Sequence, residues 1–446
     1  MTGTRLLWVL VAVEAAALWT MAWGGSGTPA PALALWGVAF AAYLLAARYG
    51  TTQLGTATDR RRIWIAGIAL RAGMFPAAPV LSEDIYRFMW DGWVQRNGVN
   101  PYLLPPSAPA LEELRTDWWP LMNHPDIPTI YPPGAQLVFA LLAWIGPAWW
   151  IFKLAWLAAD LAVAWLVHRL SRGRGPLPLL LYLWSPLVIV EVAWSGHLDP
   201  LGLAPMLGAV ALAGAAGPAW RAGALLGIGG SMKFAPLVAV PALGRLRGRR
   251  TRAAALAVAV ALAVPTVLYL PYAAAGASLF SGLRTYADIW AFNAGLYRGL
   301  ELLPGHPDLP RWIGAVVVGS LAIHAALRRW ALDRALFWTI GSALLLSPTL
   351  HPWYVLWALP FACLSLNRGW LLLSGTVFLA YAGRGAYLST GVWPEPAWLA
   401  WLIHGPPLAL LARDGWRGRR PEALARRERV PRREQGGERD RGGGAE

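Results

Sequence analysis

Residues 82–102 read SEDIYRFMWDGWVQRNGVNPY and gather charges in a chain that is otherwise largely apolar. Two adjacent acids, Glu83 and Asp84, are followed by Arg87 and Asp91. On a helix, Asp84 and Asp91 share one face, with Arg87 between them. Charged groups beside a membrane-spanning segment are costly and commonly serve a function. We therefore take this stretch as the candidate functional centre.

Composition around this stretch indicates a membrane protein. The 446 residues are 57% hydrophobic and 14% charged, whereas a soluble domain carries about a quarter charged residues. Repeated apolar runs near the length of a bilayer crossing predict an all-α polytopic fold with about 12–14 transmembrane helices. The 28 tryptophans fit the headgroup layer. A single cysteine, Cys363, excludes an intramolecular disulfide.

The net charge of +15 does not indicate a nucleic-acid partner. Arginines lie mostly between apolar runs and in the final segment 413–446, where acids are mixed with them. This segment predicts a disordered cytoplasmic tail that contacts anionic lipid. Residues 1–412 are expected to form the integral membrane domain.

Arginine positions predict which loops share a side of the membrane. Arg5, the triplet at 60–62 and the basic tail place both termini in the cytoplasm. The segment 81–149 then lies outside, and its short apolar helix at 135–145 is expected along the outer leaflet. The same count places further segments outside: 194–200, the tip of a short hairpin at Lys233, 271–310, 347–354 and 384–396.

An outward-facing site restricts the chemistry. Nucleotide-activated sugars are kept in the cytoplasm, so an external transferase needs a donor that has crossed the membrane on a lipid. A lipid-linked phosphate needs cations near the outer leaflet, and Arg87, Lys233 and Arg384 are the candidates. A carboxylate can deprotonate an acceptor hydroxyl while the phosphate leaves from the opposite face. This pattern predicts general-base catalysis with inversion.

Five motifs carry a resemblance to a known group of enzymes. In chain order they are DIYRFMWDG at 84–92, HPDIPTIYPP at 124–133, SGHLDP at 195–200, SMKFAPL at 231–237 and LSPTLHPWY at 346–354. From about residue 63 to 360, the chain resembles multi-spanning glycosyltransferases of the GT-C fold. It is most similar to the bacterial polyprenyl-phosphate-mannose-dependent mannosyltransferase-like group.

The resemblance implies roles for particular residues. Asp84 matches the catalytic base, with Glu83 beside it, and Asp199 matches a second acid in the next external loop. Arg87 and Lys233 match positions that hold the donor phosphate. The chain departs from the simplest pattern because two spans precede the acidic loop and no large external domain follows the last span. The acceptor class is therefore not carried over.

Other polar residues on the predicted outer face are candidates for substrate binding or support. Asp91 could pair with Arg87 without touching substrate, and His124 could equally shape its loop. His197 and Asp199 could hold a divalent metal with an acid of the first loop, although a hydrogen-bonded loop clamp is the commoner arrangement. No metal ligand or cofactor is assigned. The full supporting set is Tyr86, Asp91, Asn100, Tyr102, His124, Tyr131, His197, Asp199, His351 and Tyr354.

Two features concern structure alone. Arg71 and Asp160 lie well inside apolar runs, where isolated charges are costly, so we expect each to pair with the other or with Glu14 as a clamp. The helix that begins near Asp84 is expected to end at residues 100–102, since the residue before a proline resists helical geometry.

The predicted function is transfer of a sugar from a polyprenyl-phosphate donor to a lipid or glycan acceptor at the outer face of the cytoplasmic membrane. The resemblance implies mannose or another hexose. A transporter or lipid-sugar flippase is the first alternative, although such proteins place polar groups near the midplane of repeated halves. A polysaccharide polymerase or ligase is the second alternative.

Overall fold

A computed structural model describes residues 3–24, 29–54, 57–171, 174–215, 217–246 and 250–418. These residues are predominantly helical, and no β-strand forms among them beyond an isolated bridge between Phe292 and Thr349. The predicted all-α fold is therefore confirmed. Most of the predicted tail, from residue 419 onward, lies outside the described residues.

Seven helical segments are long and apolar enough to cross a bilayer in the described part of the chain. Apolar helices of this length have satisfied backbone groups, which a hydrocarbon environment requires. Other apolar runs are divided into shorter helices, so the total of 12–14 crossings stays a prediction. The seven segments are Arg5–Trp23, Ala30–Gly50, Trp149–Leu170, Leu177–Trp194, Thr251–Leu268, Leu309–Leu327 and Arg368–Thr390.

The first half of the chain contains both long helices and short connecting helices. They are α1 (Gly3–Trp23), α2 (Pro29–Gln53), α3 (Ala57–Met74), α4 (Asp84–Arg96), η1 (Pro109–Leu114), η2 (Trp119–Leu121), α5 (Pro133–Ile145), α6 (Trp149–Leu170), α7 (Leu177–Leu183), α8 (Pro186–Val188), the π-helical η3 (Ile189–Trp194) and α9 (Pro200–Ala213).

The second half has the same character. Its helices are α10 (Ala219–Met232), η4 (Ala235–Ala239), α11 (Val240–Leu243), α12 (Thr251–Leu268), η5 (Leu270–Phe280), α13 (Ser281–Ile289), α14 (Gly295–Glu301), α15 (Leu309–Leu327), α16 (Leu332–Leu345), η6 (Pro352–Trp357), α17 (Leu359–Ser365), α18 (Arg368–Thr376), η7 (Val377–Gly383), α19 (Arg384–Thr390) and α20 (Ala397–Gly418).

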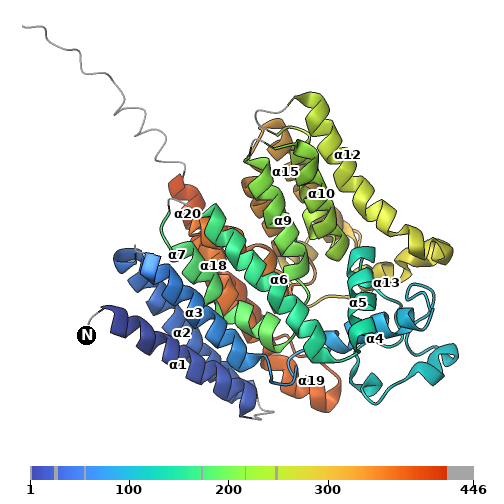
Figure 1. Ribbon diagram of the computed structural model, residues 1–446, viewed down its shortest axis with the longest axis horizontal. Coiled ribbons are helices and arrows are strands. Elements are labelled where there is room, and N and C mark those ends of the chain that lie inside the picture. Colours follow the sequence, from blue (N-terminus) through green and yellow to red (C-terminus); the bar gives the residue numbers. More distant parts are fainter. Residues whose placement is uncertain are drawn as a thin grey trace, which may run out of the picture.

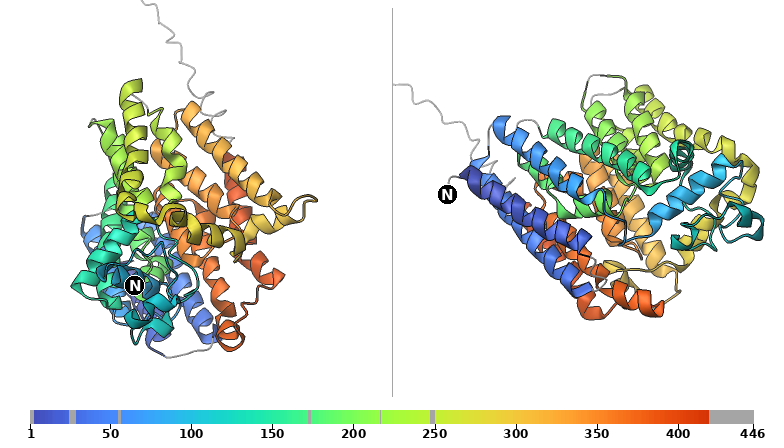
Figure 2. Two further views of the ribbon diagram at one scale, coloured as in Figure 1. Left: turned by 90° about the vertical axis from the view of Figure 1, so that its right-hand side faces the viewer. Right: turned by 60° about the horizontal axis from the view of Figure 1, so that its bottom comes forward.

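The long helices form a bundle with two flanks (Figures 1 and 2). Helices α1, α2 and α3 pack together on one flank, and α10 packs between α9 and α12 on the other. Helix α6 lies between the flanks: it contacts α9 on one side and, on the other, α7, which packs against α2 and α3. The short helices α4, α5, α13 and α19 lie toward one end of this bundle (Figure 1). That end holds the acidic stretch identified in the sequence.

Helix α4 carries the acidic motif and is fixed by close packing. Phe88 and Trp90 are buried on it, and Gly92 lies so near α5 that an added Cβ would sit 2.2 Å from the carbonyl oxygen of Phe139. The predicted end of this helix at residues 100–102 is wrong. The helix ends at Arg96, because Gly98 adopts a left-handed φ of 79° that glycine tolerates readily.

The predicted pairing of Arg71 with Asp160 is confirmed inside the bundle, and its role as a clamp stays a prediction. Arg71 Nε lies 2.5 Å from Asp160 Oδ2, and both side chains are fully buried. The Tyr182 hydroxyl donates to the other Asp160 oxygen at 2.8 Å. Arg71 also donates to the carbonyls of Gly67 and Leu183. Pairing and hydrogen bonding offset the cost of burying these charges.

Candidate active site

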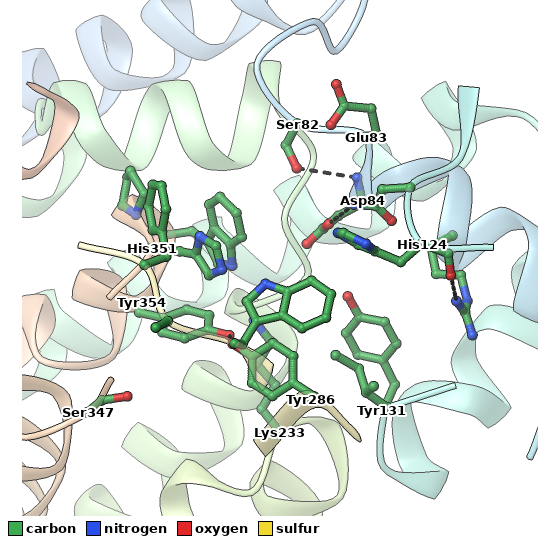
Figure 3. A pocket seen from close by; sticks show the side chains of 18 of the residues that line it. Ser82, Glu83, Asp84, His124, Tyr131, Lys233, Tyr286, Ser347, His351 and Tyr354 are labelled. Carbon is green, nitrogen blue, oxygen red and sulfur yellow. Dashed lines mark hydrogen bonds between the residues drawn. The ribbon is translucent and has the colours of Figure 1, made fainter. Parts of the chain in front are cut away.

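A cavity of about 790 Å³ opens at the end of the bundle that holds α4. Segments far apart in sequence line it, and side chains from several of them point inward (Figure 3). Most of these segments come from the loops that the arginine pattern predicts on one side of the membrane, whereas residues 381–390 form the end of the candidate span Arg368–Thr390. The lining residues fall within the ranges 81–87, 123–132, 233–235, 283–292, 343–357 and 381–393, although not every residue of these ranges takes part.

The structure separates the predicted site residues into two sets. One set lines the cavity: Glu83, Asp84, Arg87, His124, Tyr131, Lys233, His351, Tyr354 and Arg384. The other set is outside the lining, in or behind the wall: Tyr86, Asp91, Asn100, Tyr102, His197 and Asp199.

Asp84 presents a partly exposed carboxylate to the cavity. Its side chain is 19% exposed, and Oδ1 accepts a hydrogen bond from Asn123 Nδ2 at 2.8 Å. Burial raises the pKa of Asp84, while the hydrogen bond from Asn123 and the charge of Lys233 oppose that rise. Oδ2 accepts no hydrogen bond from the described residues, and a carboxylate with a raised pKa and such an oxygen is suited to accept a proton from a bound hydroxyl.

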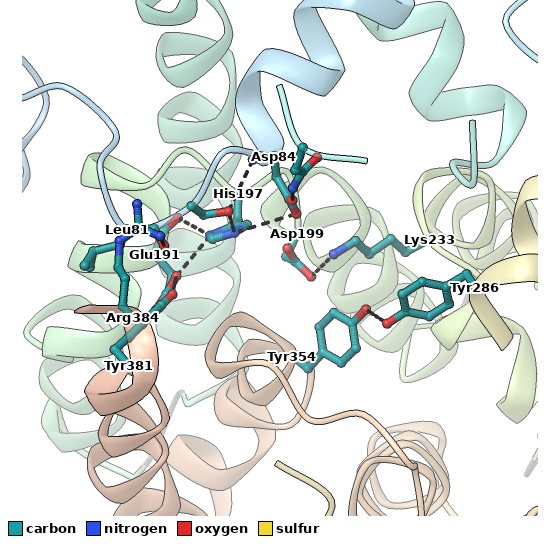
Figure 4. Close-up of polar contacts among 12 residues, drawn as sticks. Leu81, Asp84, Glu191, His197, Asp199, Lys233, Tyr286, Tyr354, Tyr381 and Arg384 are labelled. Carbon is teal, nitrogen blue, oxygen red and sulfur yellow. Dashed lines mark hydrogen bonds and ion pairs between the residues drawn. The ribbon is translucent and has the colours of Figure 1, made fainter. Parts of the chain in front are cut away.

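Two cations flank Asp84, and each is held by an acid. Lys233 Nζ lies 2.8 Å from Asp199 Oδ1, and Arg384 Nη2 lies 2.9 Å from Glu83 Oε1. The two cations appear on opposite sides of Asp84 in Figure 4. Both retain partial exposure, so each can offer further hydrogen bonds to an anion in the cavity.

Lys233 reaches this position because α10 stops one residue before it. Its backbone is extended, with φ −148° and ψ 143°, between α10 and η4. The predicted junction of the two short arms at Lys233 is therefore confirmed. The Tyr354 ring lies below the ammonium, 5.2 Å from Nζ to the ring centroid. An aromatic face adds attraction for the cation and fixes its direction.

The sequence of this chain matches a known family of enzymes. The model of the family "Alpha-(1->6)-mannopyranosyltransferase, N-terminal domain" matches residues 9–249. The chain belongs to this family. It is a glycosyltransferase, and its resemblance to mannosyltransferases is confirmed. The matched region includes Asp84, Asp199 and Lys233, whereas His351 and Arg384 lie beyond it. Searches of curated proteins and of solved structures found no match.

In this mannosyltransferase Asp91 lies in the wall behind the cavity and does not line the cavity itself. It is buried, and it accepts hydrogen bonds from Arg87 Nε at 2.9 Å, Thr129 Oγ1 at 2.5 Å and Gln136 Nε2 at 2.8 Å. These contacts join α4 to the loop before α5 and to α5 itself. Arg87 also donates to the carbonyl of His124 at 3.3 Å. The pairing of Asp91 with Arg87 that the sequence left open is the arrangement observed.

Asn100 and Tyr102 support the same wall from behind. The Tyr102 hydroxyl donates to the carbonyl of Tyr131 at 2.7 Å, and Asn100 Oδ1 accepts the Tyr102 backbone N–H at 3.1 Å. Tyr86 is half-buried and packs against the apolar cluster around Trp90. These three residues position the lining without entering it.

An aromatic stack forms another side of the cavity. Trp353 lies between His197 and His351, with ring centroids 3.9 and 4.4 Å apart, and Phe292 covers the other face of His351 at 4.7 Å. Burial, followed by the charges of Lys233 and His124, lowers the pKa of His351 to about 3. His351 is therefore neutral at physiological pH and behaves as part of an apolar wall.

Several site residues escaped the sequence interpretation. Asn123 binds the candidate base, and Trp357 donates to Asp199 Oδ1 at 2.5 Å. Glu191 contacts His197 Nδ1, and Tyr381 donates to Glu191. A signal for Glu191 was present, because it is the only charged residue in the apolar run 177–194. Asn123 and Trp357 have no comparable signal, since their roles depend on tertiary contacts.

No group of three or more His, Cys, Asp or Glu side chains is placed to hold a metal ion within the described part of the chain. His197 lies 3.9 Å from Asp84 Oδ2, and Asp199 is bound by Lys233 instead. We therefore assign no step of the reaction to a metal.

Proposed function

We propose that this mannosyltransferase moves mannose from a polyprenyl-phosphate donor to an acceptor hydroxyl at the outer face of the cytoplasmic membrane, with Asp84 as general base. The observation that carries the proposal is the Asp84 carboxylate, which faces a cavity flanked by Lys233 and Arg384. A base and phosphate-binding cations in one cavity are what a sugar phosphate donor requires.

A lipid donor is supported by the apolar part of the cavity lining. Leu283, Ile289 and Leu344 line the cavity together with the charged residues. An isoprenoid chain gains free energy from contact with such side chains. The loops that form the cavity are those that the arginine pattern predicts to be outside, where nucleotide sugars are not supplied. Both arguments favour a donor carried by the membrane.

Lys233 and Arg384 would bind the donor phosphate. The lysine supplies a compact charge and the arginine a planar fork, and both bind phosphate well. Arg87 also lines the cavity, but Asp91 and the carbonyl of His124 hold its guanidinium, so it would act on the phosphate mainly through its charge. As negative charge grows on the leaving phosphate, these cations would stabilise it more strongly than they stabilise the bound donor.

The reaction would proceed as a single displacement. Asp84 takes the proton of the acceptor hydroxyl, whose oxygen forms a bond to the anomeric carbon of mannose. The bond from that carbon to the phosphate oxygen breaks, and polyprenyl phosphate leaves with the electron pair. One displacement inverts the anomeric centre. An α-linked product, as the family description states, would therefore require a β-linked donor.

Membranes that contain the wild type or Asp84→Asn would be given polyprenyl phosphate linked to radiolabelled mannose. We expect Asp84→Asn to reduce transfer to endogenous acceptor by about 10²–10⁴-fold, the usual contribution of a general base. The matched control is Asp117→Asn, an exposed acid in the same external segment, which should transfer at the wild-type rate.

Three outcomes would overturn parts of the proposal. Wild-type transfer by Asp84→Asn would remove the base assignment. Transfer from a nucleotide-linked mannose without the lipid donor would remove the donor assignment. A product with the same anomeric configuration as the donor, determined by NMR, would remove the inverting mechanism.

A further inference from the structure

His197 is held in one tautomer by its surroundings. Its Nδ1 lies 3.1 Å from the backbone carbonyl of Glu191 and 3.0 Å from Glu191 Oε2. A carbonyl oxygen only accepts hydrogen bonds, so Nδ1 must carry the proton. In a neutral imidazole the other nitrogen, Nε2, is then an acceptor without a proton.

This bare nitrogen faces the active site (Figure 4). Nε2 lies 3.2 Å from Ser82 Oγ and 3.9 Å from Asp84 Oδ2. Ser82 Oγ also accepts the backbone N–H of Asp84 at 3.3 Å. The Ser82 hydroxyl therefore donates its proton to His197 Nε2, and it would compete for this nitrogen with Asp84 only when the Asp84 carboxyl is protonated.

The environment keeps the imidazole neutral and fixed. Burial, followed by the charge of Lys233, lowers the pKa of His197 well below its ordinary value. The ring stacks on Trp353 at 3.9 Å with an interplanar angle of 16°. The Tyr381 hydroxyl donates to both oxygens of the fully buried Glu191, at 3.1 and 3.2 Å. Gly196, with a left-handed φ of 78°, makes the turn that brings the ring here.

We propose that His197 is a positioning residue whose bare Nε2 accepts a hydrogen bond from the carboxyl of Asp84 after Asp84 has taken the proton of the acceptor. Glu191 holds the tautomer that makes this possible. The proton stays on Asp84 Oδ2 during transfer, and no bond to His197 forms or breaks. The proposal rests on the proposed role of Asp84 as base and gives it a partner that is outside the cavity lining.

The effect on pH dependence has a definite sign. A hydrogen bond made only by the protonated carboxyl favours that form and raises the pKa of Asp84. It adds to the effects of burial, Glu83 and Asp199, and opposes those of Asn123 and Lys233. Charged or titratable groups that act on His197 itself are Glu191, Lys233, His351 and Asp84. The acidic limb of the pH–rate profile reports the pKa of the base. Removing the bare nitrogen should therefore shift this limb to lower pH.

The experiment measures kcat and KM against pH in membranes, with polyprenyl phosphate mannose as the donor. His197→Phe keeps a ring against Trp353 but has no nitrogen. We expect its acidic limb to move down by about one pH unit and its kcat to fall about tenfold, with the donor KM unchanged. His197→Gln should restore part of both, because its amide oxygen can accept the hydrogen bond. The control is His324→Phe, an exposed histidine on α15.

Ser82→Ala gives a second test with the opposite sign. Without the competing hydroxyl, Nε2 is free for Asp84, so the acidic limb should move to higher pH. This variant decides the matter if His197→Phe fails to accumulate in the membrane. A limb that stays in place or moves down in Ser82→Ala would overturn the proposal, as would a wild-type limb in a well-folded His197→Phe.

The proposal and the function on which it rests fail in different ways. If Asp84→Asn transfers mannose as well as the wild type, Asp84 is not the base and both fail. If Asp84→Asn is inactive while His197→Phe keeps the wild-type kcat and acidic limb, only the role of His197 fails.

Discussion

The mannosyltransferase holds charge pairs in two settings that differ in what they leave free. Inside the bundle, Arg71 and Asp160 are 1% and 0% exposed, and Arg71 donates to three protein acceptors. At the cavity, Lys233 keeps 18% of its side chain exposed and Arg384 keeps 16%. The interior pair is closed to solvent, whereas the cavity pairs border a space that a ligand can fill.

This difference separates a structural charge from a functional one. A buried pair gives little net stability over an apolar pair, but loss of one partner leaves an uncompensated charge. A partly exposed cation loses less when its partner is removed, because water replaces it. Mutation should therefore affect folding at Arg71 and donor binding at Lys233.

The largest effect is expected from breaking the interior pair. Arg71→Met should leave Asp160 buried without its cation and destabilise the protein by about 3–5 kcal/mol. Thermal unfolding in detergent, followed by size-exclusion chromatography, measures this loss. The double variant Arg71→Met with Asp160→Leu should recover much of the stability, since apolar pairs of similar volume replace buried ion pairs well.

Arg298→Met is the matched control for that prediction. Its guanidinium is 56% exposed and pairs with Glu395 at 3.1 Å, so its loss should cost at most about 1 kcal/mol. Equal melting temperatures for Arg71→Met and Arg298→Met would show that the interior pair is not a clamp.

The Arg71–Asp160 pair was predictable from sequence because an isolated charge in an apolar run is costly and therefore seeks a partner. The same rules predicted the membrane fold and the position of Lys233 between two short arms, whereas the side of the membrane on which the polar loops lie stays a prediction. Asp84 lines the cavity as expected, since its resemblance to a motif and its place beside a span agreed. These features depend on local composition and on the cost of charge in hydrocarbon.

Other features depend on tertiary contacts that local sequence patterns do not reveal. Asp91 shares a helix face with Asp84, yet Thr129 and Gln136 bind it within the wall. Asn100 was expected to help end the helix, but the helix ends earlier, at Arg96, where the chain turns through the left-handed φ of Gly98. Asn123 has no distinguishing pattern and becomes visible only through its bond to Asp84.

An intermediate effect is expected at the cavity. Lys233→Met should raise the KM for polyprenyl phosphate mannose by about 10–100-fold, the cost of losing about 1.5–3 kcal/mol from a hydrogen bond to a charged group. The melting temperature should also fall, because the variant leaves the fully buried Asp199 without its cation; the rise in KM is what distinguishes Lys233→Met from Arg71→Met. Initial rates over a range of donor concentrations provide the measurement.

Lys233→Arg is the conservative partner of that variant. It retains the charge but changes the geometry, so its KM should lie between those of the wild type and Lys233→Met. The distinction between interior and cavity pairs would be lost if Lys233→Met unfolded like Arg71→Met while the surviving protein bound donor normally.

The smallest effect concerns acid stability at the cavity wall. His351 has a folded pKa of about 3, whereas an unfolded histidine titrates near pH 6.5. Below pH 6.5 the unfolded chain binds the proton first, so stability is complete above that pH and declines as pH falls toward 3. His351→Gln removes the contribution of this histidine to the pH dependence of stability. The drop in melting temperature between pH 7 and pH 4.5 should therefore shrink, by on the order of 1 °C for a chain of this size.

The change between the two pH values is the informative quantity, because His351→Gln also loses stacking against Phe292 and Trp353 and starts from a lower melting temperature. His124 and His197 also have lowered pKa values and remain in the variant, so part of the acid sensitivity should persist. The exposed His324→Gln should show the full wild-type drop. If His351→Gln shows that full drop as well, the histidine of the cavity wall is not held neutral by burial, and the wall is as accessible to protons as the exposed surface.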